Sequence, residues 1–386
     1  MFILLCFMVF LLLWCYFLYP VYLVVLSKFK VNRKEPIDDN YAPSVSIVIV
    51  AHNEEKVIEK TIISCLKQNY SRANFEIVVA SDHSTDTTIE IAEKYKESGV
   101  RIVQTKDRKG RANAHNEACE TITSDVIAFC DANTIWEEDT VENLVKSLAF
   151  TDVGHVSGKL CYINTDDNHV SHSEGLYWKY ELMLRKLESS LSSITAGNGA
   201  VYAIKRSCYE AIDPLYSHDI VFPSMVVKKG LRSVYNPEAL AYEKAGETTS
   251  DEYSRKVRMF GRAWHFMYKN PDVFNPFKVG LSYSIFMISH RFLRYSAGLI
   301  QAIILFISIL ILLRGYDGSS VVFNIFIVTQ LLFYVAVILG KKMILGSKGY
   351  QLYYFNLFHL ATLVGLYNAV TNKIKPFWLS PQSTRK

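Results

Sequence analysis

The sequence predicts an α/β fold, with a mostly parallel sheet covered by helices on both faces and with membrane-spanning helices at both ends of the chain. Apolar runs typical of buried strands alternate with amphipathic stretches typical of helices, which is the pattern of such a sheet. Long uncharged apolar runs precede and follow this alternating region, and 50% of the residues are hydrophobic. A length of 386 residues allows one large domain or two small ones.

The first apolar run, Met1–Leu26, contains no charged residue and is long enough to cross a bilayer. It lacks the short apolar core and the small-residue cleavage site of a signal peptide, so we expect an uncleaved anchor at residues 1–27. Three more apolar runs near the C-terminus predict further spans, at residues 296–313, 321–340 and 352–370. The last is the weakest, since it contains Asn356, His359 and Asn368.

Basic residues flank these runs and predict their orientation. They follow the first span, precede the second and follow the third: Lys28, Lys30, Arg33, Lys34, Arg291, Arg294, Lys341, Lys342 and Lys348. The positive-inside rule then places residues 28–295 in the cytoplasm, at the cell or inner membrane if the protein is bacterial, with the N-terminus outside. Four spans would place the C-terminal tail outside, yet the tail is basic, with Lys373, Lys375, Arg385 and Lys386. Either the last run does not cross the membrane, or the tail breaks the positive-inside rule.

The soluble part begins at Pro43, and four apolar runs within it predict strands, at residues 45–50, 75–80, 100–104 and 126–130. Apolar residues at helical spacing predict helices around residues 58–66, 88–98 and 141–148. We therefore expect a catalytic domain at residues 43–250. Three parts follow it: amphipathic interfacial helices at 251–295, a C-terminal membrane region at 296–370 and a tail at 371–386.

Polar clusters follow three of the predicted strands. They are Ala51-His52-Asn53-Glu54, Ser81-Asp82-His83-Ser84-Thr85-Asp86 and Asp131-Ala132-Asn133. Each cluster alone could supply helix caps. In a parallel sheet, however, ligands bind beyond the carboxyl ends of the strands, where the three clusters should meet. Together they indicate a nucleotide-binding site.

Two groups of residues suit a diphosphate. Asp131 and Asn133 offer the oxygen ligands that a hard cation such as Mg²⁺ or Mn²⁺ requires. Lys109 and Arg111 can neutralise phosphate charge, although a solvated basic loop is the plainer interpretation. Asp82 is placed to meet a base imide or a ribose hydroxyl.

A candidate general base lies further along, in His218-Asp219-Ile220. Asp219 stands between a polar loop and the apolar segment Val221–Val227. A partly buried carboxylate there is expected to have a raised pKa, suited to accepting a proton. The alternative is an N-cap of the following helix, and position alone does not decide between the two.

The stretch Asp251–Lys269 predicts a basic amphipathic helix. Its apolar stripe is Tyr253, Val257, Phe260, Trp264 and Met267, and another face carries Arg255, Arg258 and Arg262. The helix can lie on the membrane surface while Arg258 reaches the diphosphate, because the two roles use different faces.

These motifs, in this order, resemble those of membrane-anchored family-2 inverting glycosyltransferases with a GT-A fold. The branch is the one related to cellulose, chitin and hyaluronan synthases. The resemblance covers about residues 43–385. It also rests on Gly110-Arg111-Ala112-Asn113-Ala114-His115-Asn116, Tyr177-Trp178-Lys179-Tyr180-Glu181, Gly197-Asn198-Gly199-Ala200, Arg255-Lys256-Val257-Arg258-Met259 and the tail Trp378 to Arg385.

The resemblance implies a role for each motif. Asp82 would hold the uracil of a UDP-sugar, and Asp131 would bind the sugar diphosphate. Asn133 would lie on the side of the site where the metal ion binds. Asp219 would be the general base and Arg258 a diphosphate contact. The other residues expected at the donor are Ala51, Asn53, Glu54, Lys109 and Arg111, and those expected at the acceptor are Gly197, Asn198, Gly199 and Trp178.

Four positions depart from the family pattern. Asn133 stands where a metal-binding carboxylate is common, and His218 stands where an acidic residue usually precedes the base. Met259 replaces the Trp with which processive synthases stack on the growing polymer, and Arg255 replaces their Gln. The missing stacking ring favours transfer of one or a few sugars, as do the three C-terminal spans, which are too few to form an evident polysaccharide channel alone.

We therefore expect a membrane enzyme that moves a sugar from a nucleotide donor to a lipid-linked or polysaccharide acceptor, in cell-surface glycan synthesis. Membrane lipids and glycan-assembly proteins are the expected partners, and nucleic acid is not. One alternative is a processive synthase that extrudes its own polymer. Another is a catalytically silent membrane scaffold that binds nucleotide.

Overall fold

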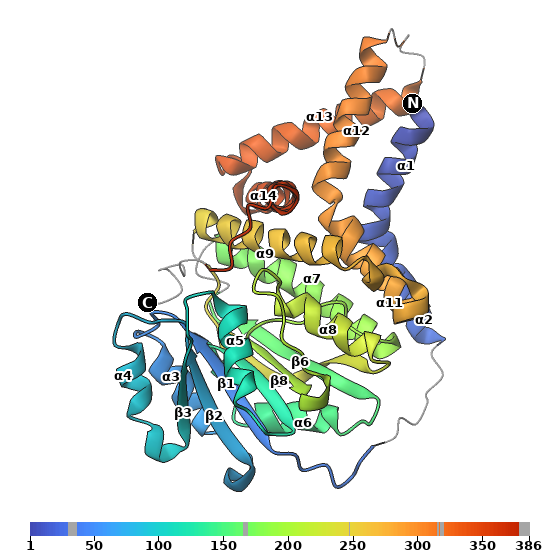
Figure 1. Ribbon diagram of the computed structural model, residues 1–386. Coiled ribbons are helices and arrows are strands. Elements are labelled where there is room, and N and C mark those ends of the chain that lie inside the picture. Colours follow the sequence, from blue (N-terminus) through green and yellow to red (C-terminus); the bar gives the residue numbers. More distant parts are fainter. Residues whose placement is uncertain (30–36, 165–168, 247, 315, 317–319, 378–386) are drawn as a thin grey trace.

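The computed structural model describes the chain except for residues 30–36, 165–168, 247, 315, 317–319 and 378–386. The tail motif Trp378 to Arg385 therefore lies outside the described residues. An α/β domain forms one end of the molecule and long apolar helices form the other, with two long helices between them (Figure 1). These two are α7 (His169–Leu191) and α9 (Thr249–Lys269).

One eight-stranded sheet organises the α/β domain, in the order β3-β2-β1-β4-β7-β6-β8-β5. The strands are β1 (Val45–Ala51), β2 (Phe75–Ser81), β3 (Val100–Gln104), β4 (Val126–Asp131), β5 (Ile135–Trp136), β6 (Val153–Tyr162), β7 (Val201–Lys205) and β8 (Arg232–Glu243). The four predicted strands are β1 to β4, and they pair in parallel. The other half is mixed: β7 is antiparallel to β4 and β6, whereas β6 and β8 are parallel.

Helices cover both faces of the sheet, as the alternating pattern predicts. One face packs against α3 (Ile58–Leu66), α4 (Thr88–Glu93) and α6 (Thr140–Leu148). The other face packs against α5 (Arg111–Glu120) and α8 (His218–Lys228), and this core continues to α9. The β1 residues alternate between the two cores, since Ile47 and Ile49 belong to the first and Val48 to the second.

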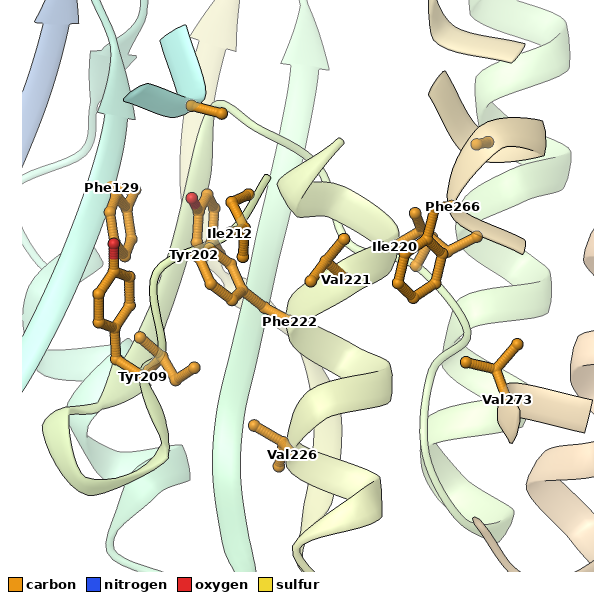
Figure 2. Packing of buried hydrophobic residues seen from close by; sticks show 14 of the residues in the cluster. Phe129, Tyr202, Tyr209, Ile212, Ile220, Val221, Phe222, Val226, Phe266 and Val273 are labelled. Atoms are coloured by element: carbon orange, nitrogen blue, oxygen red, sulfur yellow. The ribbon is translucent and has the colours of Figure 1, made fainter. Parts of the chain in front are cut away.

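Aromatic rings fill the core beneath α8. Figure 2 shows Phe129 of β4, Tyr202 of β7 and Phe222 of α8 grouped together. Phe129 and Tyr202 stack with ring centres 4.6 Å apart, and Phe129 and Phe222 with centres 5.8 Å apart. Large buried rings of this kind hold α8 firmly on the sheet. The first turn of α8 is thereby fixed at the carboxyl edge of β4.

The apolar helices comprise α1 (Phe2–Leu13) and α2 (Tyr19–Lys28), which a π-helical turn at Trp14–Leu18 joins, then α10 (Pro276–Val279), α11 (Leu281–Phe286), α12 (Ala297–Leu313), α13 (Val321–Lys341) and α14 (Gly346–Val370). Within the described part of the chain, two helices are long and apolar enough to cross a membrane, namely Phe2–Lys28 and Val321–Lys341. The helical segments Leu281–Leu293 and Ala297–Leu313 reach that length only as a pair bent by 60°.

The predicted span at residues 352–370 does not meet this test among the described helices. This stretch forms the greater part of α14, which lies beside α9, between that helix and α13 (Figure 1). The backbones pack closely, because a Cβ placed on Gly365 would meet the Gly261 nitrogen at 2.9 Å. Small residues permit such an approach. The buried His359 of α14 has a partner in the N-terminal helical segment, since its Nε2 lies 2.6 Å from the Tyr16 hydroxyl.

A buried ionic cluster fastens the α/β domain to the apolar helices. Glu181 of α7 pairs with Arg291 at 2.9 Å and with Arg294 at 3.0 Å. Glu188 of α7 contacts His290 at 2.6 Å and accepts a hydrogen bond from the Tyr19 hydroxyl at 2.7 Å. All these side chains are buried. Separating the partners of such a cluster would leave a buried charge unpaired, which costs free energy. The cluster therefore holds α7 in place against α2 and the segment 290–294.

Candidate functional site

A cavity of about 270 Å³ opens at the carboxyl edge of the sheet. All three polar clusters that follow β1, β2 and β4 contribute to it, through His52, Asp82 and Asp131. The loop before β7, the first turn of α8 and the polar face of α9 form the other walls. The prediction that the three polar clusters meet at one edge of the sheet is therefore confirmed.

Asp82 is buried, with 3% of its surface exposed, and its carboxylate holds the loop before α5. One oxygen accepts the Lys109 N–H at 3.1 Å and the other accepts the Gly110 N–H at 3.0 Å. Gly110 has φ +88°, a conformation that favours glycine, at the start of α5. The carboxylate thus aligns the loop that leads into Arg111.

The other donor residues predicted beside Asp82 divide into two groups. Glu54 lines the cavity, as does His52, whose Nδ1 lies 2.7 Å from the Asp82 carbonyl. Ala51, Asn53 and Lys109 do not line it. Ala51 is buried in β1, Asn53 binds the Thr85 N–H through its side chain, and Lys109 pairs with Asp107 at 2.8 Å on the surface.

Asp131 and Asn133 have different partners at the cavity wall. Asp131 forms an ion pair with Arg111, whose guanidinium also donates to the Gly199 carbonyl at 2.7 Å. Asn133 donates from Nδ2 to Glu243 Oε1 at 2.9 Å. This second contact arises because the chain crosses the sheet edge after β4 and pairs β5 with β8, where Ile135 faces Tyr242.

The oxygen atoms here fit a divalent cation that a diphosphate helps to bind. Asp131, Asn133 and Glu243 all line the cavity, and they offer two carboxylates and one amide. No group of three or more His, Cys, Asp or Glu side chains among the described residues could hold a metal alone. Mg²⁺ and similar ions commonly use one or two carboxylates together with substrate phosphates. The donor set suits that arrangement rather than a closed protein site.

Asp219 lies in the first turn of α8 and lines the cavity. Its Oδ1 is 3.2 Å from His218 Nε2, and its Oδ2 accepts a hydrogen bond from the Ser217 hydroxyl at 3.2 Å. The His218 ring stacks on Tyr202, with ring centres 5.4 Å apart. The main-chain carbonyl of Asp219 accepts the Gly197 N–H at 2.8 Å, which joins the proposed base to the glycine loop.

The expectation of a raised pKa for Asp219 is wrong. Burial alone would raise it, but His218, Arg111 and Arg185 outweigh burial and lower the pKa to about 2. Burial lowers the pKa of His218, so that ring is neutral at pH 7. Asp219 is therefore a carboxylate at neutral pH, able to accept a proton in a cavity rich in positive charge.

Three arginines give the cavity a positively charged lining. Arg258 and Arg262 of α9 line the cavity with Arg111. Burial, then Arg262, Arg255 and Arg111, lowers the pKa of Arg258 to about 9, and burial followed by Arg111 lowers that of Arg262 to about 10. Such crowding of positive charge is costly without an anion, and a diphosphate would relieve it.

The predicted acceptor residues also border the cavity. Gly197, Asn198, Gly199 and Trp178 all line it. Asn198 is buried, donates to the Gly158 carbonyl at 2.8 Å and accepts the Val201 N–H at 3.0 Å. Trp178 donates from Nε1 to the Leu160 carbonyl at 2.7 Å. These bonds fix the loop and the ring before any ligand binds.

Several lining residues were not predicted, namely His52, Arg185, Glu243 and Arg262. His52 was within a motif that the sequence indicated, and Arg262 belonged to the predicted basic face of α9. Arg185 and Glu243 had no local signal, because one lies within a long helix and the other ends a strand that was not predicted.

Comparisons with known proteins show which proteins this chain resembles. Residues 46–207 match the family described as Glycosyl transferase family 2. The chain is 27% identical over 255 residues to "Probable glycosyltransferase YdaM" of Bacillus subtilis (strain 168). It is 22% identical over 237 residues to "Poly-beta-1,6-N-acetyl-D-glucosamine synthase" of Staphylococcus aureus (strain COL). Each alignment covers 60% of this chain and 57% of the relative, so the chain spans little more than half the length of these curated relatives.

A solved structure resembles nearly the whole chain. It is the mannosyltransferase PcManGT from Pyrobaculum calidifontis, in complex with GDP-Man and Mn²⁺. The TM-score is 0.70, and the match covers 96% of this chain and 99% of that one. At 19% sequence identity the likeness shows the fold, which is the GT-A architecture expected from the motifs.

The Asp82 contacts generate a prediction. Replacing Asp82 with Ala removes the acceptor of two main-chain N–H groups, so we expect faster hydrogen exchange across residues 106–112 and a weaker hold on nucleotide. Hydrogen–deuterium exchange with mass spectrometry measures the first, and equilibrium nucleotide binding the second. Asp107→Ala is the matched control, since Asp107 is exposed and pairs with the Lys109 side chain rather than with the main chain of the loop. Equal exchange in both variants would contradict the assignment.

Proposed function

We propose that this chain, in which residues 46–207 form a glycosyltransferase family 2 domain, transfers a sugar with inversion from a UDP-sugar to a lipid-linked or polysaccharide acceptor. The observation that carries the proposal is one cavity in which the ionised Asp219 faces Arg111, Arg258 and Arg262. A carboxylate to receive a proton and cations to hold a leaving diphosphate are the two requirements of such a transfer.

The donor occupies the side of the cavity formed by β1, β2 and β4. His52 and Asp82 line the end where the nucleoside would bind, and the three arginines line the part where the diphosphate would bind. UDP is the proposed nucleotide. GDP-mannose is the second donor to test, because PcManGT was solved with GDP-Man.

A divalent cation is proposed as a cofactor, held by Asp131 with Asn133 and Glu243 beside it. When bound, it would neutralise the charge that develops on the leaving diphosphate. Arg111 contributes to the same end from the protein, since it can turn from Asp131 to a phosphate as the donor enters. Mn²⁺ in the PcManGT complex supports testing that ion first.

Asp219 is proposed as the general base. The acceptor hydroxyl would give its proton to the Asp219 carboxylate while its oxygen attacks the anomeric carbon, and the bond to the diphosphate breaks on the opposite side. The Ser217 hydroxyl and His218 orient the carboxylate. The positive wall keeps Asp219 ionised, and the charge of an arriving donor would make it more basic.

The acceptor is proposed to enter past Trp178 and the Gly197–Gly199 loop, at the cytoplasmic leaflet, in cell-surface glycan synthesis. The two candidate membrane helices and α9 support a membrane-bound enzyme with its cavity near the bilayer. Membrane lipids and glycan-assembly proteins are proposed partners. Nucleic acid is not among them.

Two alternatives to single transfer remain testable. The Staphylococcus aureus relative is named a polysaccharide synthase, which supports a processive enzyme. Met259 lines the cavity at the position where a processive enzyme would have a Trp that stacks on the polymer. The absence of that ring favours short products. Product length from purified enzyme separates the two, because long ladders would overturn single transfer. A silent scaffold predicts nucleotide binding with no sugar transfer and no donor hydrolysis.

The base assignment predicts the effect of Asp219→Asn. We expect kcat to fall by roughly a hundredfold to ten-thousandfold, the usual contribution of general base catalysis, because the amide cannot accept the proton. Transfer from UDP-sugars and GDP-mannose to membrane lipid extracts, followed by mass analysis, measures it. Asp213→Asn is the control, since Asp213 is exposed and does not line the cavity. Near-normal turnover in a folded Asp219→Asn protein would refute the assignment.

The pKa of Asp219 predicts a pH effect. A lowered pKa keeps the base ionised above about pH 2, so Asp219 limits activity only in strong acid. His218→Phe keeps a ring against Tyr202 but removes a group that lowers this pKa. We expect the acid limb of kcat/KM to move up by about one pH unit, the size of one lost contact to a charged group. His265→Phe is the control, because His265 lies outside the cavity. An unmoved limb would contradict the prediction.

The contact between Asn133 and Glu243 predicts the metal response. Asn133→Asp sets two carboxylates side by side, so the metal-free protein should melt at a lower temperature and the cation should bind more tightly. We expect half-maximal activity at a roughly threefold lower Mn²⁺ concentration, since a further negative charge attracts the cation. Glu243→Gln should raise the Mn²⁺ concentration that gives half-maximal activity. Metal titrations of activity and of thermal unfolding measure both, and equal responses in the two variants would exclude the site.

A further inference from the structure

Arg185 is a buried cation in the cavity wall to which the proposed transfer assigns no role. It lies in the middle of α7, has only 4% of its side chain exposed and lines the cavity. Its guanidinium carbon sits 4.7 Å from the centre of the Trp178 ring. Stacking on an indole holds the guanidinium plane in one orientation.

Two of the nitrogen donors of Arg185 make no hydrogen bond among the described residues. They are Nε and Nη1, and both are buried. The closest carboxylate contact is 3.7 Å, from Nε to Glu181 Oε1, which is beyond hydrogen-bond length. A buried guanidinium normally finds partners for its donors, because leaving them unmade costs free energy.

The neighbouring carboxylates are already engaged. Glu181 is the partner of Arg291 and Arg294, and Glu188 is the partner of His290. Three guanidinium groups, Arg185 included, thus share two carboxylates in this part of α7. The ionic cluster therefore has an excess of positive charge, and Arg185 is the member that borders the cavity.

The position of Arg185 separates it from the donor. Trp178, on which it stacks, bonds to the Leu160 carbonyl near the end of β6. In the sheet β6 lies two strands beyond β4, whereas His52 and Asp82 follow β1 and β2 on the other side of β4. Arg258 and Arg262 already serve the diphosphate, so Arg185 faces the acceptor half of the cavity.

We propose that Arg185 and Trp178 form an acceptor subsite that binds an oxyanion, a phosphate or a carboxylate carried by the acceptor. An arginine presents a rigid fork of N–H donors that matches either anion, and Trp178 sets the direction of that fork. The inference rests on the proposed transferase function and deepens it, because it makes the acceptor anionic near the hydroxyl that is glycosylated.

The test compares acceptors that differ in one group. The purified full chain is given the donor it uses and three octyl glycosides of one sugar: neutral, phosphorylated and oxidised to the uronate. We expect kcat/KM to favour one anionic acceptor, and Arg185→Gln to lower that value by roughly tenfold to a hundredfold through KM, as for a lost charge-assisted hydrogen bond. The preferred anion distinguishes phosphate from carboxylate.

Controls separate binding from structure. Lys186→Gln removes a charge from the exposed face of the same helix and should leave the acceptor preference unchanged. Arg185→Lys should restore part of the preference, because it restores the charge without the fork. A wild-type preference for the neutral acceptor, or an equal loss with all three acceptors in Arg185→Gln, would overturn the proposal.

A second measurement does not depend on transfer. With the donor site saturated by UDP and Mn²⁺, inorganic phosphate or acetate should raise the melting temperature of the wild type more than that of Arg185→Gln. Equal shifts would overturn the subsite. Absence of transfer to any acceptor, with this difference intact, would count against the proposed function and not against the subsite.

Discussion

The ion pair between Arg111 and Asp131 joins the two halves of the site. Asp131 ends β4, and the same guanidinium holds the carbonyl of Gly199, at the loop before β7. It also helps to keep Asp219 ionised. One side chain thus links the edge of the parallel strands, the glycine loop and the proposed base. Its position depends in turn on Asp82, whose carboxylate fixes the two residues before it.

Sequence reasoning found the elements whose signals are local. β1, β2 and β4 are apolar runs that end in polar clusters, and the parallel topology brings those ends together. Asp219 was likewise found, but the direction of its pKa was not. The largest lowering of this pKa comes from the neighbouring His218, whose orientation toward the carboxylate is set by the fold, and Arg111 and Arg185 add to it from distant parts of the sequence.

Pairings between distant segments explain the other omissions. The partner of Asn133 is Glu243, and the two residues meet because β5 pairs with β8. The spacing of apolar residues in the sequence does not predict this pairing. Half of the sheet is mixed for the same reason. The stretch at residues 352–370 was predicted as the weakest of the spans, and its small residues pack on α9 while its buried His359 meets Tyr16, contacts that the sequence alone does not indicate.

The wall that α9 provides has a practical consequence for handling the protein. The cavity is bordered by Glu252, Arg255 and Arg258 of that helix and by Phe377 near the chain's end. Arg262 also donates to the Pro376 carbonyl at 2.6 Å. A water-soluble fragment cut at residue 250 would keep the strand edge and Arg111 but would lose Arg258 and Arg262. Purification in detergent or nanodiscs is thus a condition for having a whole binding site to study.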